Sequence, residues 1–422
     1  MTFPRSFLVL KLVLLGVFLA AHFLPFARTR SLKIYPSVLL FYCSVAMAGI
    51  LWSVIGMLGG SELAGVLDSL RLYVAWSGAF LVIVTLLRAN GGLIAFHRAA
   101  VISAFLIALI NIAGLADYYL ETGYLTEAIR DELSLRVGIH EGYVQITSHN
   151  IGSLFFLVPY LIASQVRRDM QHSMLFPERL ALFLCLLVVA LSGRRALWIT
   201  VCVSPLIALM LAATTGSVWD LNTQRMRRIF YAAGLAGIVL GWFLLSTQLA
   251  DGLGFLTHLN EAFSSEDERS IQLGYLWDAF MDAPALGSGF GAGAGYIRSE
   301  ERPWLYELTY FQLLFNCGLI GAGYFLSILG IYFKAAAAVT RARTNVSGHA
   351  FCLLVGFFSF LVGTYSNPYL GSFDFLLYIA VLPLVASYSA GQIAGGPEPA
   401  ARAVATTKAR MSHSRLWPGT AS

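Results

Sequence analysis

Charged side chains are scarce in this sequence. Asp, Glu, Lys and Arg make up 12% of the chain, whereas a soluble globular domain carries about 25%. Hydrophobic residues make up 58%, and the mean hydropathy is +0.71. So few charges do not cover a water-facing surface, which excludes a soluble protein and predicts lipid as the main solvent. In lipid, the backbone N–H and C=O groups must bond to each other, so helices are expected. The strands of a membrane barrel alternate apolar and polar residues, and the runs 180–190 and 351–362 lack this alternation.

Paired cysteines and paired histidines are also missing. The five cysteines lie in apolar runs and none belongs to a CxxC motif, so we interpret them as small buried side chains. The eight histidines include no pair three or four residues apart, so no metal site and no cofactor is predicted. The net charge of +5 does not predict a nucleic-acid partner, because the basic residues sort by membrane side.

Long apolar runs divide the chain into membrane spans. They predict an all-α fold, a polytopic transmembrane helical bundle of about 11–12 spans with a large outward-facing loop that contains short helices. The runs are 6–27, 36–58, 70–88, 99–116, 149–166, 179–192, 195–215, 228–248, 306–333, 349–366 and 369–390. Residues 1–390 are predicted to form a single integral membrane domain, with long polar connections at 117–148 and 249–305. Residues 391–422 are predicted to form a disordered cytoplasmic tail.

Basic residues indicate which side of the membrane each connection faces. Most of the 28 Lys and Arg residues, but few of the 23 Asp and Glu residues, lie in the tail and in one set of short connections. These connections are 28–35, 88–98, 167–179, 217–228 and 334–348. The positive-inside rule places this side in the cytoplasm. Both long connections then face the non-cytoplasmic side.

Arg194 and Arg195 break this charge rule. They lie in the tight connection Ser192-Gly-Arg-Arg-Ala196 between two apolar spans, on the side that the rule disfavours. Two guanidinium groups at the membrane edge are suited to bidentate recognition of a phosphate at the level of the lipid headgroups. Ordinary snorkelling of arginines at a helix end is the alternative.

Arg269 is the next candidate. Residues 270–281 are predicted to form an amphipathic helix with Ile271, Tyr275, Trp277 and Phe280 available for packing. Arg269 stands at its start, where the helix N-terminus also favours an anion. Pairing with the acidic run 266–268 is the alternative.

The glycine-rich run 285–295 follows this helix. A phosphate-binding loop of this kind needs a strand before it and a helix after it. We therefore interpret the run as a flexible turn that lets the backbone approach a ligand or another helix.

Glu307 begins a long apolar span at its outer end. A carboxylate in this position serves as a base or hydrogen-bond partner, or it complements the helix N-terminus. The residues after it form the string Glu307-Leu-Thr-Tyr-Phe-Gln-Leu-Leu-Phe-Asn-Cys-Gly-Leu-Ile-Gly321.

Three segments together resemble the O-antigen ligase and polymerase superfamily of membrane glycosyltransferases. They are Ser192-Gly-Arg-Arg-Ala196, Arg269 with Trp277-Asp-Ala-Phe and Asp282-Ala-Pro-Ala-Leu-Gly-Ser-Gly-Phe-Gly291, and the string 307–321. Their order and spacing carry the resemblance, which covers residues 180–329.

The resemblance implies a metal-independent, inverting transfer. The donor is a glycan linked to undecaprenyl diphosphate, and the reaction occurs at the periplasmic face of a bacterial inner membrane. Arg194, Arg195, Arg269 and Glu307 are the implied catalytic residues, with the arginines on the diphosphate and Glu307 on the acceptor hydroxyl. Substrate contacts are predicted for Arg298, Arg302, Tyr310 and His149; helix capping is the alternative for His149.

Three functions remain open from the sequence, beside a structural or regulatory membrane protein whose loops bind partners. A polymerase joins lipid-linked repeat units into O-antigen or exopolysaccharide and would work with a chain-length regulator, whereas a ligase transfers the chain to lipid A–core. The chain has Glu307-Leu308 where many members, ligases in particular, carry His-Asn, so a polymerase is preferred. A transporter or flippase for lipid-linked glycans would carry charges near the middle of the membrane, and the spans have few charges away from their ends.

Overall fold

The computed structural model describes most of the chain between residues 34 and 394. The described ranges are 34–89, 92–121, 123–140, 143–148, 150–167, 176–192, 194–228, 231, 268–300, 302–342, 344, 346–371 and 379–394. Within them, five helices are long and apolar enough to cross a membrane. The protein is therefore an all-α polytopic membrane protein, as its composition predicts.

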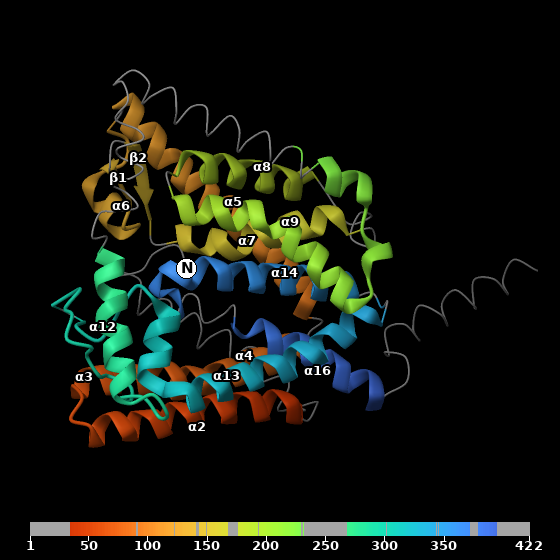
Figure 1. Cartoon of the computed structure of the whole chain (residues 1–422). Coiled ribbons are helices and arrows are strands. Elements are labelled where there is room, and N and C mark those ends of the chain that lie inside the picture. The colour runs from red at the N-terminus through yellow and green to blue at the C-terminus, as the bar shows by residue number, and fades with distance from the viewer. Residues whose placement is uncertain are drawn as a thin grey trace, which may run out of the picture.

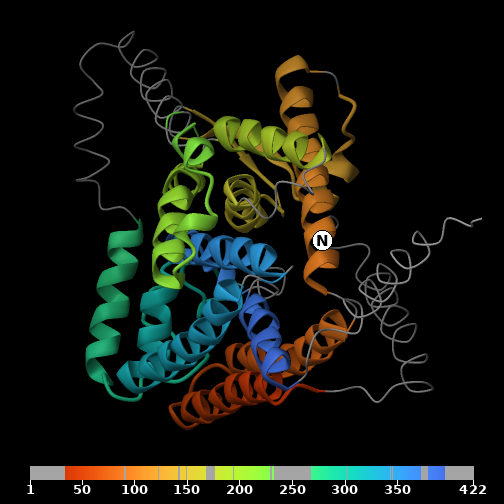
Figure 2. The ribbon, with the colours of Figure 1, turned by 90° about the vertical axis from the view of Figure 1, so that its right-hand side faces the viewer.

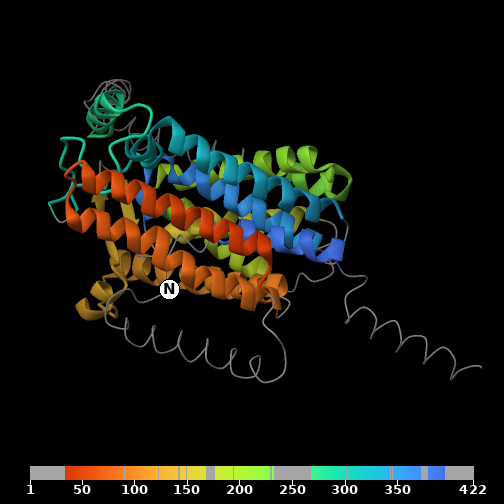
Figure 3. The same cartoon turned by 90° about the horizontal axis from the view of Figure 1, so that it is seen from below.

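The helices lie in two tiers that run in roughly the same direction (Figure 1). The lower tier consists of α2 (Pro36–Leu58), α3 (Leu63–Leu70), α4 (Trp76–Ala89), α13 (Thr309–Arg341) and α16 (Val381–Ala394). The upper tier consists of α5 (Gly92–Leu120), α7 (Leu154–Val166), α8 (Phe176–Leu191) and α9 (Arg195–Thr215). Helix α14 (Ser347–Gly363) lies between the tiers. A π-helical turn, Arg71–Ala75, joins α3 to α4, and these helices run beside α2 in Figure 3.

Helix α7 forms the centre of the upper tier. Figure 2 shows it surrounded by α5, α8, α9 and α14. All but one of its residues are buried, and α14 is nearly as enclosed. Two apolar helices of this kind satisfy their own backbone and pack through side chains alone, which is what a lipid-embedded core requires.

The two ends of the bundle differ in structure. The first, here called the loop end, carries α6 (Glu127–Glu132), the strands β1 (Arg136–His140) and β2 (Tyr143–Thr147), and α12 (Glu268–Asp282). The strands form an antiparallel hairpin with Arg136 opposite Thr147. The sequence predicts 117–148 only as a long polar connection and does not predict this hairpin. Its two strands are five residues long each, and so short a stretch gives little periodic signal.

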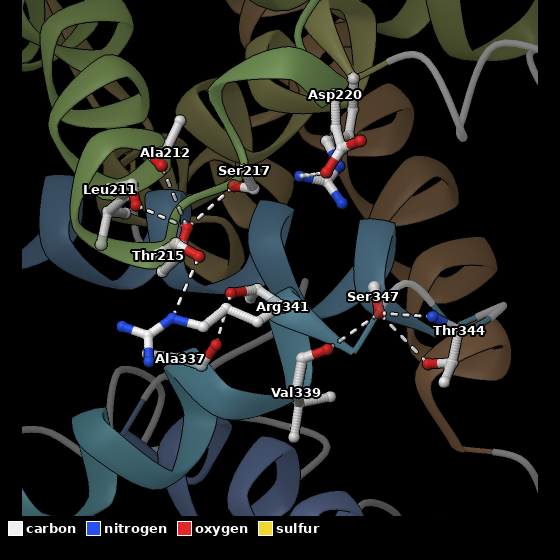
Figure 4. Close-up of polar contacts among 12 residues, drawn as sticks. Leu211, Ala212, Thr215, Ser217, Asp220, Ala337, Val339, Arg341, Thr344 and Ser347 are labelled. Carbon is white, nitrogen blue, oxygen red and sulfur yellow. Dashed lines mark hydrogen bonds and ion pairs between the residues drawn. The ribbon is translucent and has the colours of Figure 1, made fainter.

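At the opposite end, here called the basic end, side chains cap the helices (Figure 4). Arg341 near the end of α13 donates from Nε to Thr215 O at 3.0 Å and from a terminal nitrogen to Thr214 O at 2.9 Å. Ser347 at the start of α14 donates to Val339 O at 2.8 Å. These bonds satisfy carbonyl groups that a helix end leaves without a partner in the helix.

The predicted spans and the observed helices agree in place but not always in length. The span 36–58 coincides with α2, whereas the span 99–116 is the centre of a helix that runs from Gly92 to Leu120. The span 306–333 begins in a loop, and its helix continues to Arg341. The span 6–27, nearly all of the span 228–248 and nearly all of the tail lie outside the described residues. The predicted tail boundary at 391 falls inside α16.

Candidate functional site at the loop end

Helix α12 begins at Glu268, so Arg269 lies in its first turn as predicted. The packing face differs from the prediction. The buried residues are Gln272, Leu276 and Phe280, spaced four apart, whereas Ile271, Tyr275 and Trp277 are exposed. Only Phe280 of the predicted packing residues is buried, because the face that meets α13 includes a polar residue that an apolar pattern does not select.

Glu307 accepts hydrogen bonds from two arginines. The Nε atom of Arg269 donates to Glu307 Oε2 at 3.0 Å, and a terminal nitrogen of Arg298 donates to Glu307 Oε1 at 2.8 Å. The side chain of Glu307 is 21% exposed, that of Arg298 29% and that of Arg269 49%. The carboxylate is therefore held between two guanidinium groups at a partly open surface, and the trio carries a net positive charge.

Backbone contacts fix the position of Glu307. Its N–H donates to the side-chain carbonyl of Gln272 at 3.1 Å, and Gln272 is fully buried. Gln312 accepts from the N–H of Tyr306 at 3.2 Å and donates to Trp304 O at 2.8 Å. The two glutamines replace hydrogen bonds that the loop before α13 cannot make by itself. The sequence predicts neither glutamine as a site residue, since an uncharged side chain in an ordinary local pattern gives no signal.

Arg194 lies in the turn between α8 and α9 and is held by uncharged groups. Its guanidinium donates to Ile146 O at 3.2 Å, to Thr147 Oγ1 at 3.2 Å and to Tyr369 Oη at 3.4 Å. The turn is also bonded to β2 through Ile146 N and Ser192 O at 3.2 Å. The hairpin thus orients Arg194, while these contacts leave its positive charge uncompensated.

The turn around Tyr369 connects the two groups of arginines. Arg194 bonds to the phenol of Tyr369, and Thr309, two residues after Glu307, donates to Asn367 O at 2.9 Å. Burial raises the pKa of Tyr369, the Arg194 guanidinium opposes this shift, and the Glu307 carboxylate adds to it. Arg194 and Glu307 therefore both lie close enough to Tyr369, in the short turn η5 (Pro368–Gly371), to act on its hydroxyl.

The remaining predicted site residues stand as follows. Arg195 is the first residue of α9, but its side chain and the whole of His149 lie outside the described part. Arg302 is exposed in a turn closed by its N–H and Ser299 O, and no contact among the described residues joins it to Glu307. The hydroxyl of Tyr310 bonds to Leu361 O at 2.5 Å and to Thr364 at 3.0 Å, so it links α13 to α14.

The glycine-rich run is not a flexible turn. The N–H groups of Ser288 and Gly289 donate to Phe315 O at 3.0 Å and Asn316 O at 2.9 Å, and Phe290 N donates to Trp52 O at 2.9 Å. The other half of the prediction is confirmed, because this backbone does approach two helices closely. Since these three N–H groups are already bonded to carbonyls, they do not form a phosphate cradle.

A second polar cluster lies inside the bundle, towards the basic end. His97 of α5 is bonded through Nδ1 to the hydroxyl of Tyr160 at 2.7 Å and through Nε2 to Glu178 of α8 at 2.9 Å. The ring of His349 lies 5.1 Å from that of His97. The sequence reading placed Glu178 in a polar connection, whereas the structure buries it in the first turn of α8. The residues come from four helices, so no local motif reveals them.

Comparisons of the chain with known proteins found no match. No model of a protein family matches the chain. No curated protein matches it significantly. The class of the protein therefore rests on its composition and helices, and its function is argued from the residues at the loop end.

Proposed function

We propose that this protein is a membrane glycosyltransferase that polymerises oligosaccharide units linked to undecaprenyl diphosphate. The observation that carries the proposal is the arrangement at the loop end. One carboxylate, Glu307, lies between two arginines, and a third arginine, Arg194, bonds to the adjoining turn and has no ion pair among the described residues. Cationic groups next to a carboxylate suit a reaction in which a diphosphate leaves as a hydroxyl loses its proton.

The step balances with these residues alone. A hydroxyl oxygen of the acceptor sugar forms a bond to the anomeric carbon of the donor sugar. The bond from that carbon to the diphosphate oxygen breaks, and the electron pair leaves with the lipid diphosphate. Glu307 takes the hydroxyl proton, while Arg194 binds the charge that develops on the leaving group. The donor and acceptor both have lipid tails, so their reacting groups lie at the membrane surface, where a site at the end of apolar helices is also located.

The position of the site further supports transfer on one side of the membrane. Arg269 belongs to α12 and shares Glu307 with Arg298, and Arg194 bonds to Thr147 of β2. All four residues therefore belong to the loop end, where the sequence predicts the non-cytoplasmic side. The buried His97–Glu178 pair lies towards the other end and is enclosed. A transporter needs charged groups that both sides reach in turn, which this separation does not favour.

The proposal is tested by reconstitution of the purified protein in lipid vesicles. One set of samples contains an undecaprenyl-diphosphate-linked repeat unit, and a second set also contains lipid A–core. A ladder of products with the repeat unit alone is the expected result. A single product that requires lipid A–core would assign a ligase instead. Absence of transfer in both sets, with the protein shown to be folded, would overturn the proposal.

A further inference from the structure

Helix α13 is broken in its first third. Gly318 has φ 61° and ψ −170°, which interrupts the helix and frees backbone groups on both sides of the break. The segment 284–289 bonds to these groups. Leu319 N donates to Pro284 O at 2.9 Å and Ile320 N to Ala285 O at 3.1 Å, in addition to the bonds from Ser288 and Gly289 to Phe315 and Asn316. In an apolar surrounding, a broken helix persists only when such partners are present.

Trp52 of α2 completes this junction. Its indole N–H lies 2.8 Å from Leu286 O and 3.1 Å from Cys317 O, so one donor serves the loop and the helix at the break. Its own carbonyl accepts from Phe290 N at 2.9 Å. The side chain is 2% exposed. Trp52 thus holds α2, the segment 284–290 and α13 together from a single position.

Close backbone packing leaves this junction little freedom. A Cβ atom on Gly289 would lie 2.1 Å from Gly56 N, and one on Gly318 would lie 2.4 Å from Ala285 O. Gly289 also has a positive φ of 84°, which other residues rarely adopt. Close packing of this type transmits a displacement of one segment to the next.

The segment that leaves the junction leads directly to the site. Ala294 N donates to the hydroxyl of Tyr306 at 2.7 Å, and Tyr306 precedes Glu307. Arg298 lies between them in the chain. Tyr306 and Phe315 also share a buried cluster with Leu276 and Phe280 of α12. The described residues 268–300 and 302–317 therefore form one packed unit, which carries Arg269, Arg298 and Glu307 and joins α2 at Trp52.

We propose that Trp52 is a positioning residue, which sets the place of Glu307 relative to Arg194 by fixing the segment 284–290 in the break of α13. The inference rests on the proposed function for its catalytic consequence. Its structural consequence, an ordered segment 284–308, is independent of the reaction.

The test compares Trp52→Phe with Tyr332→Phe. Each substitution removes a side-chain donor that joins α13 to α2, since the hydroxyl of Tyr332 bonds to Ser37 O at the basic end. Replacement of Trp52 by β-(3-benzothienyl)alanine, which keeps the indole shape and lacks the N–H, covers the case in which the smaller phenyl ring prevents folding. Hydrogen–deuterium exchange of the peptides covering 284–290 and 296–308 is measured with the rate of chain extension.

We expect amide exchange in both peptides to be about tenfold faster in the two Trp52 variants, because the carbonyls of Leu286 and Cys317 lose their shared donor. We expect kcat to fall about tenfold with KM for the lipid-linked unit unchanged, since misplacement of a reacting group affects the transition state. Tyr332→Phe leaves all three quantities at the wild-type level.

Unchanged exchange and kcat in both Trp52 variants would overturn the proposal. Faster exchange with unchanged kcat would also overturn it, because Trp52 would then have a purely structural role. If the wild-type protein transfers no sugar, the proposed function fails; faster exchange at 296–308 would still support the role of Trp52 in placing that segment.

Discussion

Arg194 and the pair Arg269–Arg298 present positive charge in two different ways. Among the residues that the structure describes, the guanidinium of Arg194 donates only to uncharged oxygens, those of Ile146, Thr147 and Tyr369. Its direction is set by a hairpin and a turn. Arg269 and Arg298 share the Glu307 carboxylate, which cancels one of their charges. Residues of the same type thus differ in the positive charge that they present to a ligand, because their neighbours differ in charge.

The difference suggests a division of roles at the loop end. An uncompensated, oriented guanidinium binds a dianionic diphosphate without first losing another ion pair. A guanidinium that is already paired with a carboxylate has less charge to offer a diphosphate. Arg269 and Arg298 are therefore better suited to hold Glu307 in place next to the acceptor. The four predictions below test this division, from the largest expected effect to the smallest.

The largest effect is expected for Glu307→Gln. The amide keeps the size of the side chain but takes up no proton, and chain extension should fall by about a thousandfold if Glu307 is the general base. Product ladders from reconstituted vesicles measure the rate. Glu268→Gln is the matched control, because Glu268 accepts from Tyr296 at 2.9 Å on the same surface, and no ion pair among the described residues joins it to Arg269 or Arg298. Full activity in Glu307→Gln would exclude a base at this position.

Arg194→Ala should slow chain extension by about a hundredfold, the usual cost of losing one donor to a developing negative charge. Arg194→Lys should fall between Ala and wild type, since lysine keeps the charge and loses the planar fork. Arg71→Ala, which removes an exposed arginine paired with Asp68 at 2.9 Å, should have no effect. Equal rates for Arg194→Ala and Arg71→Ala would contradict a special role for Arg194.

Arg269→Ala and Arg298→Ala should each reduce the rate by about tenfold, because the remaining arginine still pairs with Glu307. The double substitution should cost more than the product of the two, since the carboxylate then has no partner. A double-mutant cycle on initial rates measures this coupling. Strict additivity would show that the two arginines act independently and that the shared carboxylate is unimportant.

Tyr369→Phe should have the smallest effect, about twofold on the rate, because Arg194 keeps two of its three partners. Burial raises the pKa of Tyr369, so the folded protein holds the phenolic proton more tightly than the unfolded chain does. Stability is therefore lost as pH rises above ~10, and the variant should lose less of it there than wild type. Thermal unfolding in detergent between pH 7 and ~11 checks this, and identical curves would contradict it.

Local signals in the sequence were sufficient for much of the fold. The span 36–58 coincides with α2, because the mean hydropathy of a segment depends on its own residues and needs no tertiary information. Arg269 at the start of α12 and the arginines in the turn before α9 were also placed correctly. The packing face of α12 and the hairpin at 136–147 were not, because they depend on which surface covers them.

Contacts between distant segments account for the rest of the site. Arg269 and Glu307 are 38 residues apart, and Arg194 and Tyr369 are 175 residues apart. Trp52 and Leu286 are separated by 234 residues. Nothing in one sequence pairs such residues, since each has an ordinary local environment and gains its partner only when the helices pack.

The sequence alone determined that this chain is a bundle of apolar helices, because transfer of a helix into lipid is a sum over its own residues. It also determined which arginines stand at helix ends. Only the tertiary structure decided that the glycine-rich run bonds to the backbone at the break in α13, that Trp52 bonds to both, and that Glu307 pairs with two arginines. Hydrogen bonds depend on distance and direction, and these are fixed by how separate helices pack against each other.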